Sequence, residues 1–433
     1  MLKLQTNSAL SAKTFQKYRT RIKKAEKVLA KMKYSEYRSL PYQDVEKLLK
    51  QIQKFKTGFS DIVIIGIGGS MLGTQMLYHI LGESLQQNSN ATPSRETKNK
   101  SKNPINKSIP KFHFIDNIDP TFIASLGEKL SDKKKTLFIF VSKSKNTLEI
   151  VSLFKLITGG APKWFGKNWN NHIIIITENK KGFLYKKVTE NNLSSFKMPK
   201  FVGGRYSILT AAGLIPTALM GLDIRKLLQG ASHVEQSDSR KSSTNTNSPN
   251  NFEQKTQIND TAKKLALLIY HLYKNKKKNT LALFPYINCF ESFNKWAIQL
   301  IAESLGKNSK VGPLPISLIG AKDQHSILQL LLDGPKDKWV LFFELEKHPH
   351  DYKIDKFSFS QILKAEKTGT EKALTKKKIQ NATLTLQKLD EENLGELIFT
   401  FENAVALAGI LLKVNPFNQP AVELGKKITA EIL

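Results

Sequence analysis

The feature that most constrains the fold is a series of short, almost wholly apolar segments, each followed by a turn and a helical pattern. The first, Asp61–Ile65, ends in Gly66-Ile67-Gly68-Gly69-Ser70 and precedes an apolar helix expected over 71–81. Such runs are typical of central strands in parallel sheets, which are buried on both faces. The other expected strands are Lys111–Ile115, Thr136–Val141, His172–Thr177, Thr280–Phe284, Pro315–Ile319 and Trp339–Phe343. Two successive sets of strands and helices predict an α/β protein with two parallel-sheet domains, each with helices on both faces.

Helical patterns flank the two sheets. Apolar residues recur at helical spacing between residues 12 and 57, which predicts an N-terminal helical arm, and helices are also expected to close the chain. Other expected helices are 262–273, capped by Asp260-Thr261, 291–305 and 326–332. Two polar stretches without periodicity, 86–108 and 237–257, predict surface insertions. The expected divisions are 1–57 for the arm, 58–200 for the first domain, 201–260 for a connecting helix with the second insertion, 261–390 for the second domain and 391–433 for C-terminal helices.

Composition limits the possible partners and compartment. The 433 residues carry a formal net charge of +30, but the lysines are spread along every segment, which favours a solvated surface over a nucleic-acid interface. A polyanion partner stays the alternative, and a diffuse positive field would also attract a phosphorylated substrate. The single cysteine, Cys289, expected to be buried, excludes an intrachain disulfide and favours a reducing cytosol. No signal peptide and no window of ~18 apolar residues is apparent.

The segment Val202-Gly203-Gly204-Arg205-Tyr206-Ser207 is the most informative short motif. Arginine is scarce, at seven of the 67 basic residues, so its use here suggests that a planar, permanently charged group is needed. We expect the two glycines to take positive φ and to aim Arg205 into a cleft. The alternative is an ordinary turn with a solvated arginine.

Two loops at strand ends carry hydroxyl groups and precede helices. They are Gly66–Ser70 and the segment Ser142-Lys143-Ser144-Lys145-Asn146-Thr147. Unpaired amides and the positive end of a helix dipole make such loops suitable for anions, and ligands bind at the carboxyl ends of strands in open α/β sheets. The first is neither a dinucleotide fingerprint, because Met71 stands where the third glycine would be, nor a P-loop. The alternative for the second is a helix cap with a solvated lysine.

Two titratable residues are candidates for proton transfer. Glu303 lies in the last turn of an expected helix, on the side of Trp296 and Leu300, and both this position and its apolar surroundings should raise its pKa. His325 follows Asp323, an expected N-cap, so it should lie in the first turn of a helix, where the dipole lowers the pKa of an imidazole. The alternatives are an exposed glutamate and a packing or capping histidine.

Six segments, in this order, resemble the phosphoglucose isomerase (glucose-6-phosphate isomerase) family. They cover residues 65 to 426, nearly the whole chain, and are Ile65–Gly73, Ser142–Ser144, Val202–Ser207 with the helix that follows, Ala302–Lys307, Asp323–Ser326 and Phe417–Lys426. The resemblance implies a pair of sugar-isomerase (SIS) domains, with the N-terminal arm and the C-terminal helices packed on the second. It also implies interconversion of glucose 6-phosphate and fructose 6-phosphate, in glycolysis and gluconeogenesis, in the cytoplasm.

The resemblance also implies roles for individual residues. Glu303 would move the proton between C1 and C2, and Arg205 would stabilise the enediol formed on the way. His325 would open the sugar ring from the neighbouring subunit of a homodimer, with Lys426 beside the ring oxygen. Lys426, about two turns into an expected terminal helix opened by Pro420, would otherwise be taken as solvated. The residues that match substrate-binding positions are Gly69, Ser70, Ser142, Lys143, Ser144, Thr147 and Gln419.

Several departures and alternatives remain. The chain has Lys200, Lys145-Asn146, Asn418 and Ala421 where the family commonly has other residues, which affects phosphate binding and the turn before Lys426. The chemistry needs neither a metal nor a redox cofactor, and no nucleic-acid or membrane partner is expected. The alternatives are a non-catalytic protein that senses sugar phosphates, which would not need Glu303, and an isomerase that also accepts mannose 6-phosphate.

Overall fold

The computed structural model describes residues 2–90, 109–144, 146–178, 182–237 and 256–433. The chain forms two units: a continuous unit, Gln43–Arg225, and a composite unit made of Met1–Tyr42 and Lys226–Leu433. Most of each polar insertion, namely 91–108 and 238–255, lies outside the described residues. The finer divisions expected at residues 57, 200, 260 and 390 stay a prediction.

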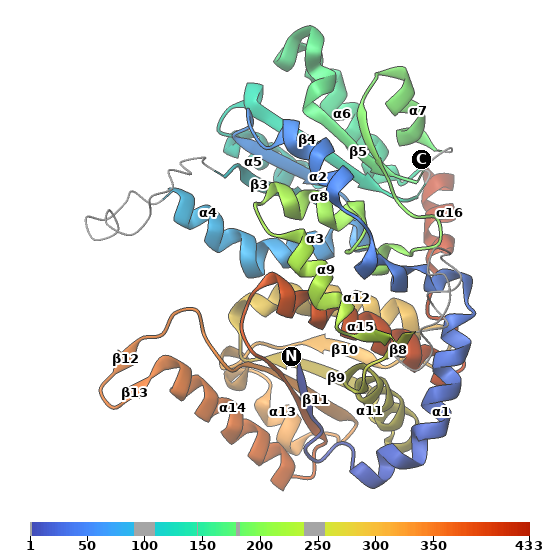
Figure 1. The fold of residues 1–433 in the computed structure, drawn as a ribbon, viewed down its shortest axis with the longest axis vertical. Coiled ribbons are helices and arrows are strands. Elements are labelled where there is room, and N and C mark those ends of the chain that lie inside the picture. Colours follow the sequence, from blue (N-terminus) through green and yellow to red (C-terminus); the bar gives the residue numbers. More distant parts are fainter. Residues whose placement is uncertain (1, 91–108, 145, 179–181, 238–255) are drawn as a thin grey trace. The chain divides into compact units, whose positions relative to one another are not determined.

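The continuous unit contains a five-stranded parallel sheet in the order β3-β2-β4-β5-β6. Figure 1 shows β3, β4 and β5 of this sheet among the helices of the unit. Its strands are β2 (Asp61–Ile65), β3 (Lys111–Ile115), β4 (Thr136–Ser142), β5 (Ile173–Thr177) and β6 (Ser194–Lys197). Its helices are α2 (Glu46–Ile52), α3 (Leu72–Leu77), α4 (Glu83–Asn90), α5 (Pro120–Lys129), α6 (Leu148–Phe165), α7 (Phe183–Glu190) and α8 (Ala211–Leu219). The strand order reverses between β2 and β4, which makes their carboxyl ends the ligand-binding switch point of a doubly wound sheet.

Alternate residues of each central strand face opposite sides of this sheet. Val63, Phe138 and Ile175 pack with residues of α5, α6 and α7 in one apolar core. Their neighbours Ile64, Ile139 and Ile174 are equally buried on the other face. Near-continuous apolar strands are what a sheet covered on both faces requires. The helix expected over 71–81 is shorter as an α-helix, because α3 changes to a π-helical turn over Tyr78–Gly82 before α4.

The composite unit contains a second five-stranded sheet, in the order β1-β14-β11-β9-β10. The strands β9 (Thr280–Pro285), β10 (Leu314–Ser317), β11 (Lys338–Leu345) and β14 (Asn381–Leu386) are parallel, and β1 (Lys3–Gln5) pairs antiparallel with β14. No strand was expected after Phe343, and helices were expected over 391–433; the helices are present, but further strands precede them. The chain there forms the hairpin β12 (Lys353–Ile354) and β13 (Phe357–Ser358), then α14 (Phe359–Lys376) and β14.

Helices cover both faces of this sheet as well. The helices of this unit are α1 (Ala12–Ala30), α9 (Ile224–Ser232), α11 (Asp260–Lys276), α12 (Glu291–Leu305), α13 (Leu328–Asp333), α14, α15 (Glu391–Leu411) and α16 (Val422–Ile432), of which α16 buries none of its described residues. On one face Phe343 of β11 contacts Phe293 of α12 and Phe401 of α15, with ring centroids 5.3 Å and 6.0 Å apart. On the other face Phe342 packs with residues of α13 and α14.

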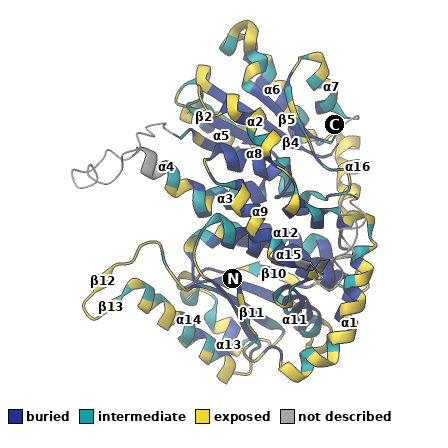
Figure 2. Cartoon of the chain, viewed as in Figure 1, coloured by how far each residue is buried: buried dark blue, intermediate teal, exposed yellow. Residues whose placement is uncertain are grey.

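Helix α15 is the central helix of the composite unit. Almost all of its side chains are buried, as Figure 2 shows. By length and composition alone it could cross a membrane, which corrects the expectation that the chain has no such window, but 94% of the apolar window is buried inside the protein. It is the pattern of a core helix, which is apolar on all sides because it is covered on all sides.

Three smaller expectations also need correction. Helix α11 is capped by Asn259, whose side chain accepts a hydrogen bond from the backbone N–H of Ala262, so Asp260-Thr261 begin the helix and do not cap it. Cys289 is half-buried, where burial was expected. The expected helix over 326–332 begins later, at Leu328, after a 3-10 turn over Lys322–His325.

Candidate active site

The first glycine loop and the Gly-Gly-Arg turn touch backbone to backbone. A Cβ atom added to Gly69 would lie 2.3 Å from the carbonyl carbon of Gly204 and 2.5 Å from the nitrogen of Arg205, far too close for any side chain. The Ser207 hydroxyl donates to the carbonyl of Gly204 at 2.7 Å and lies 3.3 Å from that of Gly69. These contacts join the loop after β2 to the turn before α8.

The reason for the glycines differs from the one predicted. Gly203 has φ −66°, and Gly204 is not among the glycines with positive φ, so the expected positive φ in this turn is wrong. In the two loops only Gly68 takes positive φ, at 57°. The glycines are needed at this contact because two backbones approach closely, which leaves no room for a side chain at Gly69.

Arg205 is buried within this contact. Only 2% of the residue is exposed, so the alternative of a solvated arginine is also wrong. It lies in a 3-10 turn over Gly204–Tyr206, with its guanidinium carbon 5.7 Å from the centroid of the Tyr206 ring. Thr210 then caps α8 by accepting from the N–H of Ala212. A buried arginine on a turn that is packed against another loop has little freedom to move, and electrostatic stabilisation of a reacting group requires such a fixed charge.

The second predicted loop follows β4 on the other side of the switch point. The Ser142 side chain is buried, and its oxygen lies 3.4 Å from Thr147 Oγ1 and 3.3 Å from the carbonyl of Ser144. Thr147 is the N-cap residue of α6, but within the described residues its side chain makes no capping hydrogen bond. The hydroxyl groups are thus gathered at the beginning of a helix without serving as its cap, which disfavours the simple capping alternative and suits anion binding.

Lys143 has contacts that the sequence did not predict. Its Nζ donates to the backbone carbonyls of Lys200 and Val202, each at 2.6 Å. Both carbonyls belong to the short segment before Arg205, and Val202 immediately precedes Gly203. Lys143 therefore connects the hydroxyl loop after β4 to the Gly-Gly-Arg turn, and all three predicted segments of the continuous unit are in one place.

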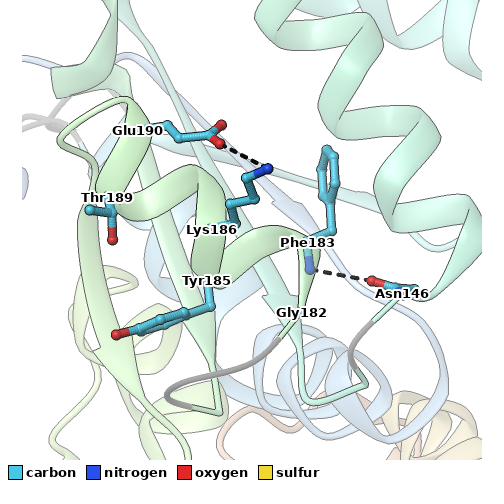
Figure 3. A pocket seen from close by; sticks show the side chains of 7 residues that line it. All are labelled: Asn146, Gly182, Phe183, Tyr185, Lys186, Thr189 and Glu190. Carbon is cyan, nitrogen blue, oxygen red and sulfur yellow. Dashed lines mark hydrogen bonds and ion pairs between the residues drawn. The ribbon is translucent and has the colours of Figure 1, made fainter.

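A shallow surface pocket lies next to this loop but is separate from the predicted residues. Figure 3 shows its lining, which comes from α7 and from Asn146, whose side-chain oxygen accepts from the N–H of Phe183 at 3.3 Å. Lys186 and Glu190 form an ion pair of 3.5 Å on the same helix. None of the predicted site residues lines this pocket, so it does not define the candidate site.

In the composite unit, Glu303 lies in the last turn of α12, as predicted. Its side chain is half-buried beside a helix face that buries Trp296 and Leu300. Gln299, one turn earlier, donates its side-chain amide to Glu303 Oε1 at 3.0 Å. Lys307 donates both to the backbone carbonyl of Glu303 and to that of Asn418. The carboxyl group is therefore held by its own helix, and the end of this helix is connected to the C-terminal segment.

The segment that carries Gln419 is anchored by Phe417. This ring is buried and stacks on Tyr34 of the N-terminal arm, with centroids 6.3 Å apart and planes at 25°. The Phe417 N–H also donates to the Asn415 side chain at 3.0 Å. Gln419 itself is exposed, next to Asn418 and its contact with Lys307. The structure thus brings the Gln419 segment to the carboxyl end of the Glu303 helix.

Lys426 lies on α16, which begins at Val422 and not at Pro420. Lys426 is therefore little more than one turn into the helix, where two turns were expected. Its side chain is 62% exposed and forms a 2.7 Å ion pair with Glu423. Because α16 buries none of its described residues, packing does not orient Lys426.

His325 is not at the beginning of an α-helix. It ends the 3-10 turn Lys322–His325, and α13 begins after Ile327. Asp323 does not cap α13, because its carboxylate accepts instead from the N–H of Ile319 at 2.7 Å and from the Ser326 hydroxyl at 3.0 Å. His325 therefore does not lie in the first turn of an α-helix, where it was expected. The imidazole is exposed.

Glu303 and His325 lie at opposite ends of their sheet. Helix α12 returns from the carboxyl end of β9 to the amino end of β10, so Glu303 lies at the amino-terminal edge. His325 follows the carboxyl end of β10. The four residues of β10 alone span roughly 13 Å. Within one composite unit these two side chains therefore do not act on the same small molecule.

Comparison with known proteins agrees with the fold. Over the whole chain the structure is similar to that of a hypothetical protein from Thermus thermophilus, with TM-score 0.81, 27% identity and 99% of that chain covered. It is also similar to a glucose-6-phosphate isomerase from Chlamydia trachomatis, with TM-score 0.78 and 20% identity, covering all of this chain and 88% of that one. A tagatose-6-phosphate ketose/aldose isomerase from Escherichia coli matches 91% of this chain and 95% of that one, with TM-score 0.52 and 11% identity.

Sequence relatives narrow the assignment. A glucose-6-phosphate isomerase from Methanocaldococcus jannaschii is 34% identical over 393 residues, which cover 88% of this chain and 86% of that protein. One from Carboxydothermus hydrogenoformans is 31% identical over 414 residues, covering 91% and 83%. The family model for phosphoglucose isomerase matches residues 22–343 and 351–433.

Fold and relatives together define an α/β sugar-phosphate isomerase with two SIS-type sheets. The chain belongs to the phosphoglucose isomerase family. Every predicted site residue, from Gly69 to Lys426, lies inside the matched ranges.

Proposed function

We propose that this chain opens the ring of a sugar phosphate and then moves a proton through a cis-enediol. The overall activity follows from the family: the chain is an aldose-ketose isomerase that interconverts glucose 6-phosphate and fructose 6-phosphate, as in glycolysis. The observation that carries the assignment is the match of nearly the whole chain, including all predicted site residues, to this family.

Ring opening is the first step of the proposed mechanism. A proton leaves the anomeric hydroxyl while another reaches the ring oxygen, so one group must accept and one must donate. We assign these transfers to His325 and Lys426. The support is that both side chains are exposed and neither is locked into a helix cap or a buried ion pair.

Proton transfer between carbons is the second step. The Glu303 carboxylate takes the proton from C2 of the open aldose, and the electrons form the C1–C2 double bond of a cis-enediolate whose O1 takes up a proton. The O2 hydroxyl then gives up its proton as the C2 carbonyl forms, and Glu303 returns its proton to C1. Negative charge develops on the oxygens of this intermediate, and Arg205 stabilises it. The support is the fixed, buried guanidinium of Arg205, since a preorganised charge stabilises a transition state without further reorganisation.

The phosphate group is assigned to the loops at the switch point. Gly69 and Ser70 would offer a backbone and a hydroxyl group after β2, and Ser142, Ser144 and Thr147 would offer hydroxyl groups after β4. Lys143 adds positive charge to this loop and keeps it next to the Arg205 turn through its two carbonyl contacts. Gln419 is assigned to the same substrate, on the composite unit.

We further propose a homodimer in which His325 serves the site of the neighbouring subunit. The support is the distance between Glu303 and His325 within one composite unit, together with an exposed apolar hairpin on that unit. Tyr352, Ile354 and Phe357 are all exposed there, and Figure 2 shows this hairpin in the exposed colour. Exposed apolar groups of this kind mark interaction surfaces. We propose a cytoplasmic location because the sequence has a single cysteine, Cys289, and therefore no intrachain disulfide.

The decisive experiment is turnover of fructose 6-phosphate by the wild type and by Glu303→Gln, measured with a coupled assay. We expect turnover by the wild type and a loss of roughly 10³-fold or more in the variant, with sugar-phosphate binding retained. Glu291→Gln is the matched control, because Glu291 is an exposed glutamate in the first turn of the same helix. Binding of sugar phosphate without turnover by the wild type would instead favour a sensor.

A further inference from the structure

The loop that carries His325 packs against the buried side chain of Tyr286. Tyr286 has no role in the mechanism proposed above. Tyr286 immediately follows β9 and is 2% exposed. The side-chain amide of Gln324, the neighbour of His325, donates to the Tyr286 hydroxyl at 2.6 Å. That hydroxyl in turn donates to Thr370 Oγ1 of α14 at 3.1 Å. The loop is therefore connected through Tyr286 to a core helix.

The Tyr286 ring makes a second contact with the same loop. A Cβ atom at Gly320 would lie 2.5 Å from the ring carbons, so the loop backbone lies directly on the ring. The Gly320 N–H also donates to the carbonyl of Pro285 at 2.9 Å. The ring holds the beginning of the loop and the hydroxyl holds its end, next to His325.

The rest of the loop is closed by its own hydrogen bonds. Asp323 accepts from Ile319 N–H and from Ser326 Oγ, and its own N–H donates to the Ile319 carbonyl at 2.7 Å. Such a loop moves as one body, so its orientation depends on the contacts that anchor it to the sheet. Burial raises the pKa of Tyr286, so its hydroxyl keeps its proton at neutral pH and can accept from Gln324 while donating to Thr370.

We infer that the Tyr286 hydroxyl, bridging Gln324 and Thr370, is a positioning group for ring opening: it orients the loop that presents His325. This rests on the role assigned to His325 under the proposed function. Tyr286 itself touches no substrate. Its loss should therefore slow only those reactions that require the sugar ring to be opened.

The test compares a sugar phosphate that forms a ring with one that cannot. Fructose 6-phosphate closes its ring through the hydroxyl on C5, and 5-deoxyfructose 6-phosphate lacks that hydroxyl while its C6 oxygen is esterified. The deoxy compound is therefore open-chain. Enzyme-catalysed exchange of the C1 proton in D₂O, followed by NMR, measures the enediol step for both compounds with the same readout.

We expect Tyr286→Phe to lower exchange with fructose 6-phosphate roughly 10- to 100-fold, because a small displacement of a proton-transfer group costs about that much. Exchange with 5-deoxyfructose 6-phosphate should stay within about twofold of the wild type. Phenylalanine keeps the ring under Gly320. Gln324→Met removes the same hydrogen bond from the other side and should reproduce the selectivity, so a folding defect in one variant leaves the other to decide.

Two further variants separate the possible failures. Tyr18→Phe, which removes a hydroxyl bonded to Asn275 at 2.6 Å on the same unit, is the matched control and should change neither substrate. His325→Asn should show the same selectivity, and Tyr286→Phe should add little to it, because residues that act in series are not additive.

Equal losses with both substrates in Tyr286→Phe and Gln324→Met, while His325→Asn stays selective, would overturn the positioning role and leave the proposed function intact. A His325→Asn variant without selectivity would overturn the role of His325 and, with it, the inference about Tyr286.

Discussion

The two units build their parts of the candidate machinery in opposite ways. In the continuous unit, Arg205 is buried, and Gly69 and Gly204 are in backbone contact. In the composite unit, the groups assigned to proton transfer are accessible: Glu303 is half-buried, His325 is exposed, and Lys426 lies on a helix that buries none of its described residues. In the continuous unit the charged group is buried next to a close backbone contact. In the composite unit the accessible side chains lie in the last turn of a helix, at the end of a 3-10 turn and on an exposed helix.

The difference follows from what each part must do. A group that stabilises developing charge works best when its position is fixed before the reaction begins. A group that transfers protons must reach more than one oxygen or carbon atom and must change its protonation state, which requires access to the substrate and to solvent. We therefore expect substitutions that alter side-chain shape or displace the backbone to lower activity most in the continuous unit. Substitutions that remove a titratable group should lower activity most in the composite unit.

The largest effect is expected for Arg205→Lys. Lysine keeps the charge but cannot reproduce a fixed planar guanidinium, so kcat should fall roughly 10²- to 10³-fold while the KM changes little. Steady-state kinetics with fructose 6-phosphate measure this. Arg225→Lys, on an exposed pair with Glu46 in the same unit, is the control and should leave kcat unchanged. Equal kinetics for both lysine variants would show that a fixed guanidinium is not needed.

A change of a single methyl group tests the backbone contact. Gly69→Ala should lower kcat/KM at least roughly tenfold, because the new Cβ atom would displace the backbone of the Arg205 turn and with it the guanidinium. Gly159→Ala is the control: its Cβ atom would meet nothing within 4 Å, and alanine in a helix should stabilise the protein by about 0.5–1 kcal/mol. A fully active Gly69→Ala variant would contradict the rigid arrangement of the continuous unit.

A smaller effect is expected for Lys426→Gln. The variant lacks the amino group that we assign, with His325, to ring opening, so turnover of fructose 6-phosphate should fall roughly tenfold. The adjacent Lys427→Gln has the same change of charge on the same exposed helix and should have no such effect. If the two variants lose activity equally, the field of the positively charged chain is responsible, and raising the ionic strength should then reduce the wild-type rate as well.

The smallest effect concerns stability and contrasts two buried acids. Asp61 of the continuous unit accepts hydrogen bonds from His113, Ser60 and the N–H of Ser131. Glu402 of the composite unit has no partner for either oxygen among the described residues, and burial raises its pKa well above 4.5. Glu402→Met should therefore stabilise the protein by roughly 1–3 kcal/mol at pH 8, whereas Asp61→Leu should destabilise it.

The pH dependence gives the sign of this effect. Because the folded-state pKa of Glu402 is raised, folding must protonate this group once the pH exceeds the unfolded value of 4.5. The stability cost is therefore absent below about pH 4.5 and grows as the pH rises towards the folded value. Thermal unfolding of the wild type and of Glu402→Met should give similar midpoints near pH 4 and diverge at pH 8. A constant difference would mean that packing, and not charge, is responsible.

Elements with a strong local pattern were predictable. The limits of Asp61–Ile65, Lys111–Ile115 and the helix 291–305 agree with the structure to the residue. β14 was missed because Asn381–Leu386 alternates polar and apolar residues and resembles no buried strand. All six residues are buried, since β1 pairs with this strand and Asn7 donates to the side chains of Asn381 and Thr383. These hydrogen bonds join residues 374 and 376 positions apart in the chain.

The candidate site shows the same division. Arg205 and Glu303 were proposed from their residue type and position, and each lies in the expected segment, Arg205 in the turn before α8 and Glu303 in the last turn of α12. The reason for Gly69, the carbonyl contacts of Lys143 and the turn that carries His325 were not predicted. Each depends on contacts with backbone atoms of another segment. Because every residue type has the same backbone atoms, the residue types of that segment do not reveal such contacts.

The sequence by itself determined the fold class, the family and the residue types available for chemistry, because hydrophobic periodicity and short motifs are local properties of a chain. Only the tertiary structure decided which groups are rigid and which are accessible, that Glu303 and His325 lie at opposite ends of one sheet, and that Tyr286 anchors the His325 loop. The physical reason is that burial and hydrogen-bond partners are set by segments far apart in the chain, and these segments meet only when it folds.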